Sequence, residues 1–148
     1  MNISIYTDAA HNQDNGCTGV GYLIHTEDCY VDMDSVAINS MSSVAAETMA
    51  IYRAIVNLID RVNLVPEDIV TIYTDSMKAV RILKGIDKVV GTDRQVFSRT
   101  MAIYKKLCSL CTVKLYWVQG HNKEYSQNTL VDRLAKYAIR YTQIASQE

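Results

Sequence analysis

The tetrapeptide Ile5-Tyr6-Thr7-Asp8 occurs a second time in the chain, as Ile72-Tyr73-Thr74-Asp75. Each copy ends a segment with the pattern of a β-strand, which we expect to stop at its Asp. The carboxyl ends of parallel strands meet at one edge of an open α/β sheet, where ligands usually bind. Adjacent strands lie about 4.8 Å apart. Parallel pairing of the two copies would let both carboxylates reach one cation, which predicts a metal site.

The segments around these copies predict an α/β fold with one five-stranded mixed sheet flanked by helices. Strands are expected at residues 3–8, 18–26, 29–38, 69–74 and 112–118. The first three are expected to be antiparallel, because only two residues separate the second from the third. The apolar run at 69–74 indicates a strand buried on both faces.

Helical periodicity and capping residues predict four helices. They lie at 43–61, 75–84, 93–110 and after Ser126. The polar stretch 11–17 is expected to be a turn. The resulting order is βββαβααβα, and we expect residues 1–148 to form a single domain.

The composition is typical of an ordinary globular protein. The 148 residues are 49% hydrophobic and 21% charged, which excludes a disordered tail, a collagen-like fibre and a coiled coil. No apolar run reaches the roughly 18 residues of a membrane span, so we expect a soluble, cytoplasmic protein. We also expect it to be a monomer. The four cysteines lack the spacing of a zinc site and are expected to be buried, reduced thiols.

A net charge of −1 hides an uneven distribution. Residues 1–60 contain one basic and eight acidic side chains, whereas residues 97–148 contain eight basic and three acidic ones. An acidic half suits metal ions and a basic half suits phosphates. Chance segregation on a solvated surface would explain the same counts.

Two further acids stand among apolar residues. Glu47 lies one turn into the helix at 43–61, and Asp132 lies near the start of the last helix. Burying an unpaired carboxylate is costly, so we expect Glu47 to reach solvent or to meet a cation. Structural explanations also exist, because Asp75 fits a helix cap, Asp8 an Asx-turn and Asp132 the helix dipole.

Together, the four acids predict a particular kind of metal centre. Carboxylates without a His or Cys cluster suit Mg²⁺ or Mn²⁺ better than zinc. Two such ions, about 3.5–4 Å apart, activate water and stabilise the leaving oxygen of a phosphoryl displacement. No P-loop, nucleophile elbow or dinucleotide fingerprint competes with this interpretation.

Five motifs, in this order, resemble the type 1 ribonuclease H family. They are Tyr6-Thr7-Asp8, Ala46-Glu47-Thr48-Met49-Ala50, Tyr73-Thr74-Asp75-Ser76, Trp117-Val118-Gln119-Gly120-His121-Asn122 and Asn128-x-x-x-Asp132-x-Leu134-Ala135. The likeness covers essentially the whole chain, and the predicted element order is similar to that fold. No single motif is specific, but all five in this order make coincidence improbable.

The resemblance implies an endonuclease that cuts the RNA strand of RNA/DNA hybrids. Two Mg²⁺ ions, with Mn²⁺ as a substitute, would serve the reaction, which leaves 5′-phosphate and 3′-hydroxyl ends. By the same resemblance, Asp8 bridges both ions, and Asp75 and Asp132 complete the shell of the ion that activates water. Glu47 serves the other ion and the substrate 2′-hydroxyl.

Two more positions carry roles that only the resemblance implies. His121 matches a mobile histidine that assists proton transfer or product release. Asn128 matches a residue that helps to orient the site.

The chain departs from the pattern of the family in two places. The loop at 11–19 lacks a Gly-Asn-Pro-Gly-like run, and Ser42, Ser43 and Val44 replace the Asn or Thr residues that touch DNA phosphate and 2′-hydroxyls. Ser42 or Ser43 is able to contact a phosphate, but the Val44 side chain cannot hydrogen-bond. The resemblance therefore implies metal-dependent cleavage more strongly than strict hybrid preference.

Other interpretations remain open from the sequence. Arg94, Arg99, Lys105 and Lys106 on the helix at 93–111 resemble, in a thinner form, the basic element that some members of the family use, and a solvated helix face would also explain them. A catalytically silent hybrid-binding module is one alternative function, although the complete set of four acids argues against it. A nuclease of this fold that acts on DNA is another.

Overall fold

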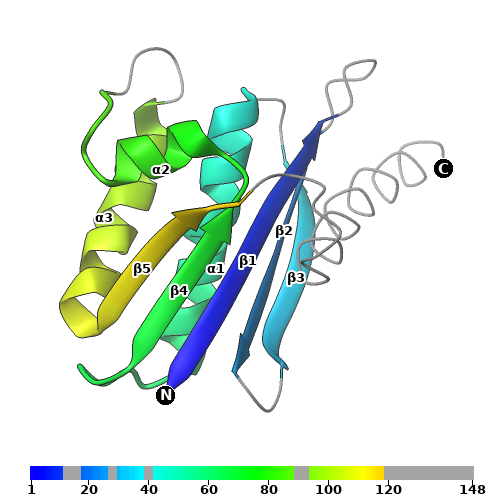
Figure 1. Ribbon diagram of the computed structural model, residues 1–148. Coiled ribbons are helices and arrows are strands. Elements are labelled where there is room, and N and C mark those ends of the chain that lie inside the picture. Colours follow the sequence, from blue (N-terminus) through cyan, green and yellow to red (C-terminus); the bar gives the residue numbers. More distant parts are fainter. Residues whose placement is uncertain (12–17, 27–29, 39–41, 89–93, 119–148) are drawn as a thin grey trace, which may run out of the picture.

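The computed structural model describes residues 1–11, 18–26, 30–38, 42–88 and 94–118. These ranges form one five-stranded sheet and three helices (Figure 1). The elements are β1 Asn2–His11, β2 Thr18–Thr26, β3 Tyr30–Ile38, α1 Ser43–Arg61, β4 Ile69–Thr74, α2 Met77–Leu83, α3 Arg94–Leu110 and β5 Thr112–Trp117. The expected loop at 12–17 and the expected helix after Ser126 lie outside the described residues.

The sheet confirms the predicted fold class. Its strand order is β3-β2-β1-β4-β5. β2 pairs antiparallel with both β1 and β3, and β4 pairs parallel with both β1 and β5. In the parallel pair, Ile5 stands beside Ile72 and Tyr6 beside Tyr73. The two copies of the tetrapeptide therefore lie side by side and in register.

The predicted end of the first strand is wrong by three residues. β1 continues to His11, because β2 pairs with it as far as Thr18, and Asp8 lies opposite Gly21 in this ladder. The pairing of β1 with β4 stops earlier, at Tyr6 and Tyr73. An antiparallel ladder thus holds Asp8 beyond the point where β4 ends.

The main core lies between the sheet and helices α1, α2 and α3. Core side chains come from β1, β2, β4 and β5 and from all three helices. In β4, Val70, Ile72 and Thr74 are buried, whereas the alternate residues are only partly buried. The expectation that this strand is buried on both faces is therefore wrong for one face, whose residues are only partly buried.

On the other face of the sheet, aromatic rings form a row across the central strands. The Tyr6 and Tyr73 rings stack with centroids 4.8 Å apart, and the Tyr116 ring lies 6.1 Å from the ring of Tyr73. Such cross-strand aromatic pairs add to sheet stability. The second residue of each tetrapeptide therefore reinforces the parallel register.

Helix α1 begins where the sequence predicts. The Ser42 side chain accepts a hydrogen bond from the Ala45 N–H at 3.1 Å, which caps the first turn. Ala45, Ala46 and Ala50 are fully buried near this end, so the first turns of the helix pack closely. This packing places Glu47 at the edge of the core.

The two cysteines in the described part of the chain differ in exposure. Cys111 is buried as expected, but Cys108 is exposed on α3, so the expected burial is wrong there. No helix in the described part of the chain is both long and apolar enough to cross a membrane.

Candidate metal centre

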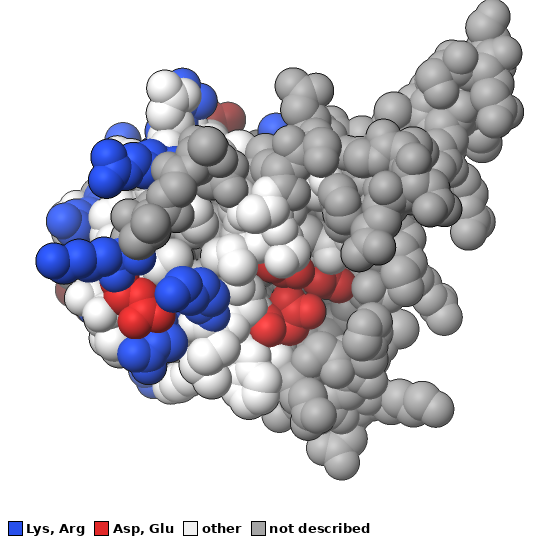
Figure 2. Space-filling view, turned by 90° about the horizontal axis from the view of Figure 1, so that it is seen from above, with Lys and Arg blue, Asp and Glu red and all other residues white. Residues whose placement is uncertain are grey.

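Three carboxylates that are far apart in the sequence meet at one edge of the sheet. Asp8 of β1, Glu47 of α1 and Asp75, directly after β4, each offer a carboxylate oxygen, and these oxygens lie within 4.8 Å of one another. Figure 2 looks onto this edge and shows acidic side chains gathered there. The structure thus brings together three of the four acids that the sequence singles out.

Backbone pairing and two side-chain contacts fix the position of Asp8. The Ala9 N–H donates to Asp8 Oδ1 at 2.8 Å, which orients the carboxylate. One residue earlier, the buried Thr7 hydroxyl donates to the Tyr73 carbonyl at 3.2 Å. This bond ties β1 to β4 immediately before both Asp residues.

Asp75 is not the cap of the helix that follows it. Ser76 takes that position, because its hydroxyl oxygen accepts the Ala79 N–H at 3.1 Å. The carboxylate of Asp75 is therefore not committed to capping. The Trp117 indole N–H donates to the Asp75 backbone carbonyl at 3.0 Å, which anchors this residue to the end of β5.

Glu47 is the electrostatically strained member of the cluster. It is partly buried, and its Oε2 atom is shielded from solvent without a hydrogen-bond partner among the described residues. Burial, followed by the negative charges of Asp8 and Asp75, raises the pKa of Glu47 well above its ordinary value. A proton or a cation at this carboxyl group would relieve that cost.

The donor set fits a hard divalent cation. Mg²⁺ and Mn²⁺ prefer oxygen ligands, whereas structural zinc sites use mainly Cys and His. The three residues of the cluster supply carboxylate oxygens only. A divalent ion would also neutralise the repulsion that raises the pKa of Glu47.

The family of the chain follows from comparison with known proteins. The RNase H family profile matches residues 1–140, which is most of the sequence. The chain belongs to the ribonuclease H family. The resemblance seen in the five motifs is confirmed, and the protein is an enzyme of this family. No curated protein sequence matches the chain significantly.

Solved structures of ribonucleases H share the fold. The N-terminal RNase H domain of Mycobacterium tuberculosis rv2228c has a TM-score of 0.74 and 20% identity, covering 94% of this chain and 99% of that one. RNase H1 from Halobacterium salinarum has a TM-score of 0.75 and 20% identity, with coverages of 95% and 98%. LC11-RNase H1 in complex with an RNA/DNA hybrid has a TM-score of 0.74 and 23% identity, with coverages of 95% and 99%.

The remaining predicted site residues fall into two groups. His121, Asn128 and Asp132 lie outside the described residues. Ser42 and Ser43 are exposed at the start of α1, where the Ser42 oxygen is already engaged in capping. The substrate and catalytic roles of these five residues in this ribonuclease H stay predictions.

Sequence reasoning assigned no role to Thr7 and Trp117 beyond membership of a motif. Both act on main-chain carbonyls, Thr7 on Tyr73 and Trp117 on Asp75. A hydrogen bond to a main-chain carbonyl does not depend on the type of the partner residue, so the sequence carries no signal of it. Only the pairing of β4 with β1 and β5 brings them within reach.

The pKa of Glu47 gives a stability prediction. Because it is raised in the folded state, the stabilising contribution of this group is present below the ordinary value of 4.5 and is lost as the pH rises through the raised pKa. At pH 7.5 without divalent metal, Glu47→Gln should raise the Tm by about 2–4 °C, because it removes a carboxylate that burial and repulsion destabilise by about 1 kcal/mol. Differential scanning calorimetry measures this shift.

The exposed Glu67 provides the matched control. Glu67→Gln should leave the Tm unchanged, and the advantage of Glu47→Gln should shrink as the pH falls towards 4.5. Adding Mg²⁺ should stabilise the unmodified protein more than the Glu47→Gln variant. A lower Tm for Glu47→Gln at pH 7.5 would contradict the assigned repulsion.

Trp117 gives a prediction about metal affinity. Trp117→Phe keeps an aromatic ring but removes the N–H that anchors Asp75. Loss of this bond should raise the Mg²⁺ concentration for half-maximal thermal stabilisation by about 3- to 5-fold. Tyr116→Phe, at the exposed neighbouring position, should leave that concentration unchanged. Equal values for the two variants would show that Trp117 does not position Asp75.

Proposed function

We propose that this protein hydrolyses the RNA strand of RNA/DNA hybrids and leaves 5′-phosphate and 3′-hydroxyl ends. The observation that carries the proposal is the cluster of Asp8, Glu47 and Asp75, whose carboxylate oxygens lie within 4.8 Å of one another. Membership of the ribonuclease H family supports the substrate class. A structural neighbour, LC11-RNase H1, is itself known in complex with an RNA/DNA hybrid.

We propose Mg²⁺ as the cofactor, two ions per site, with Mn²⁺ able to replace it. Asp8, Glu47 and Asp75 would hold the ions, and Asp132 would complete the ligand set. When bound, the ions supply activation of the attacking water and stabilisation of the leaving oxygen. The support for this cofactor is the all-oxygen donor set and the shielded Glu47 oxygen.

The described residues would contribute positioning and control of a proton. The hydrogen bonds from Ala9 and Trp117 hold Asp8 and Asp75 at fixed points of the sheet edge. Glu47, with its raised pKa, would give up its carboxyl proton when a cation enters. His121 is proposed to assist proton transfer or product release, and Asn128 to orient the site.

Substrate contacts are proposed at the start of α1. Ser42 and Ser43 are exposed there, and their hydroxyl groups are able to donate hydrogen bonds to a phosphate. The side chain of Val44 instead packs against the apolar cluster of Ala45, Ile82 and Phe97. Its replacement of a polar residue therefore serves packing, and we propose that 2′-hydroxyl recognition relies on Glu47.

We propose that the protein is a cytoplasmic monomer and that residues 1–148 form one catalytic domain. The alternatives are a catalytically silent hybrid-binding module and a nuclease acting on DNA. The silent module is disfavoured because the three clustered carboxylates keep an electrostatically costly arrangement that hybrid binding alone does not need. Cleavage assays distinguish all three.

The test compares hybrid, duplex DNA and duplex RNA, each with and without Mg²⁺. The RNA strand of the hybrid should be cut only with Mg²⁺, and end analysis of the fragments should find 5′-phosphates. Asp75→Asn should lower the rate by at least about 100-fold. Even the loss of a residue that only hydrogen-bonds to a metal ligand typically lowers activity about 10- to 100-fold.

A matched control is available on α1. The exposed Asp60 lies thirteen residues beyond Glu47, about 20 Å along the helix, so Asp60→Asn should retain full activity. Undiminished cleavage by Asp75→Asn would refute the proposed site. Tight hybrid binding without turnover would favour the silent module, and comparable cutting of duplex DNA would favour the DNA nuclease.

A further inference from the structure

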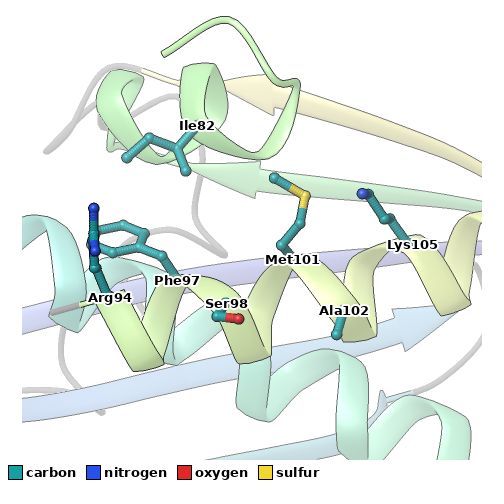
Figure 3. A pocket seen from close by; sticks show the side chains of 7 residues that line it. All are labelled: Ile82, Arg94, Phe97, Ser98, Met101, Ala102 and Lys105. Carbon is teal, nitrogen blue, oxygen red and sulfur yellow. The ribbon is translucent and has the colours of Figure 1, made fainter. Parts of the chain in front are cut away.

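A groove separate from the acidic cluster lies between α2 and α3. Its volume is about 620 Å³, and it is formed by Ile82 of α2 and by residues of α3 from Arg94 to Lys105. Figure 3 shows Ile82 facing the side of α3 that carries Phe97 and Met101, with Arg94 and Lys105 towards opposite ends. The sequence did not single out this arrangement.

The groove has an apolar floor. Ile82 and Phe97 are 4% and 6% exposed, and the more exposed Met101 continues the apolar surface along α3. Ser98 and Ala102, both small and exposed, line the groove without filling it. The floor therefore suits one or two large apolar side chains of a ligand.

Two cations stand at the ends of this floor. Arg94 and Lys105 are exposed, and neither forms an ion pair with any residue in the described part of the chain. The nearby cations of α2 differ, because Lys78 and Arg81 both bind Asp87, at 3.3 and 3.0 Å. The charges beside the groove are thus available to an anionic partner.

We propose that this groove binds an acidic peptide segment of a partner protein, with apolar side chains on the floor and a carboxylate at each end. Arg94 and Lys105 are eleven residues apart, which is about 16 Å along the helix. An extended chain covers that distance in about five residues. The matching segment therefore carries two acidic residues five positions apart with large apolar residues between them.

The apolar floor favours a peptide over the sugar-phosphate backbone of a nucleic acid. Phosphate contacts come from cationic and hydrogen-bonding groups and require no apolar surface. Hot spots of peptide recognition, in contrast, combine a buried apolar anchor with charged groups at the rim. The arrangement of Ile82, Phe97 and Met101 between Arg94 and Lys105 has this form.

Fluorescence anisotropy with the full chain tests the proposal. The probe is a labelled hexapeptide with Asp at both ends and Ser-Leu-Phe-Ser between them. One control peptide has Asn in place of each Asp, and another has Gly-Gly in place of Leu-Phe. The probe should bind, and each control should bind at least about five-fold more weakly, since each loses one class of contact.

Variants locate the binding on the protein. The double variant Arg94→Gln/Lys105→Gln should weaken probe binding by about five-fold or more. Arg99→Gln/Lys106→Gln removes two exposed cations of the same helix that do not line the groove and should bind the probe normally. Circular dichroism should show that both variants fold, because all four positions are exposed.

Three results would overturn the proposal. They are the absence of probe binding up to about 1 mM, equal probe affinity in the two double variants, and a loss of hybrid affinity in Arg94→Gln/Lys105→Gln as large as the loss of probe affinity. The last result would assign the groove to nucleic acid. Hybrid cleavage at the acidic cluster should be unchanged in this variant. Cleavage assays therefore test the proposed ribonuclease H activity, and anisotropy tests the proposed peptide binding, independently of each other.

Discussion

Parallel pairing of β1 with β4 is the constraint on which the candidate site depends. It sets two identical tetrapeptides in register, so that their tyrosines stack and their aspartates meet at the sheet edge. The Thr7 hydroxyl bonds across the pair immediately before that edge. A slip of one residue would turn the side chains of one strand to the opposite face, and the carboxylates would no longer converge.

This geometry carries an electrostatic cost that the fold tolerates. Close packing of the alanine-rich start of α1 brings Glu47 to Asp8 and Asp75, where burial and repulsion raise its pKa. Stored strain of this kind is typical of functional sites, because the ligand that relieves it gains binding energy. A divalent cation is the natural counterpart of three carboxylates at one point.

Much of this was predictable from the sequence. Helix α1 and β2 have the predicted bounds, and the repeated tetrapeptide correctly indicated the meeting of Asp8 and Asp75. Periodicity could not show that β1 runs on to His11, because its antiparallel ladder with β2 decides that end. The bond from Trp117 to a main-chain carbonyl and the groove between α2 and α3 depend on packing between distant segments, which no local pattern encodes.

Anomalous X-ray scattering from crystals soaked in Mn²⁺ would show whether the three carboxylates bind a divalent cation. We expect Mn²⁺ peaks between Asp8, Glu47 and Asp75, with carboxylate oxygens at about 2.0–2.3 Å from the ion. The proposed metal centre is contradicted if the three carboxylates keep the observed arrangement, at a pH where they are ionised, and no anomalous density lies between them.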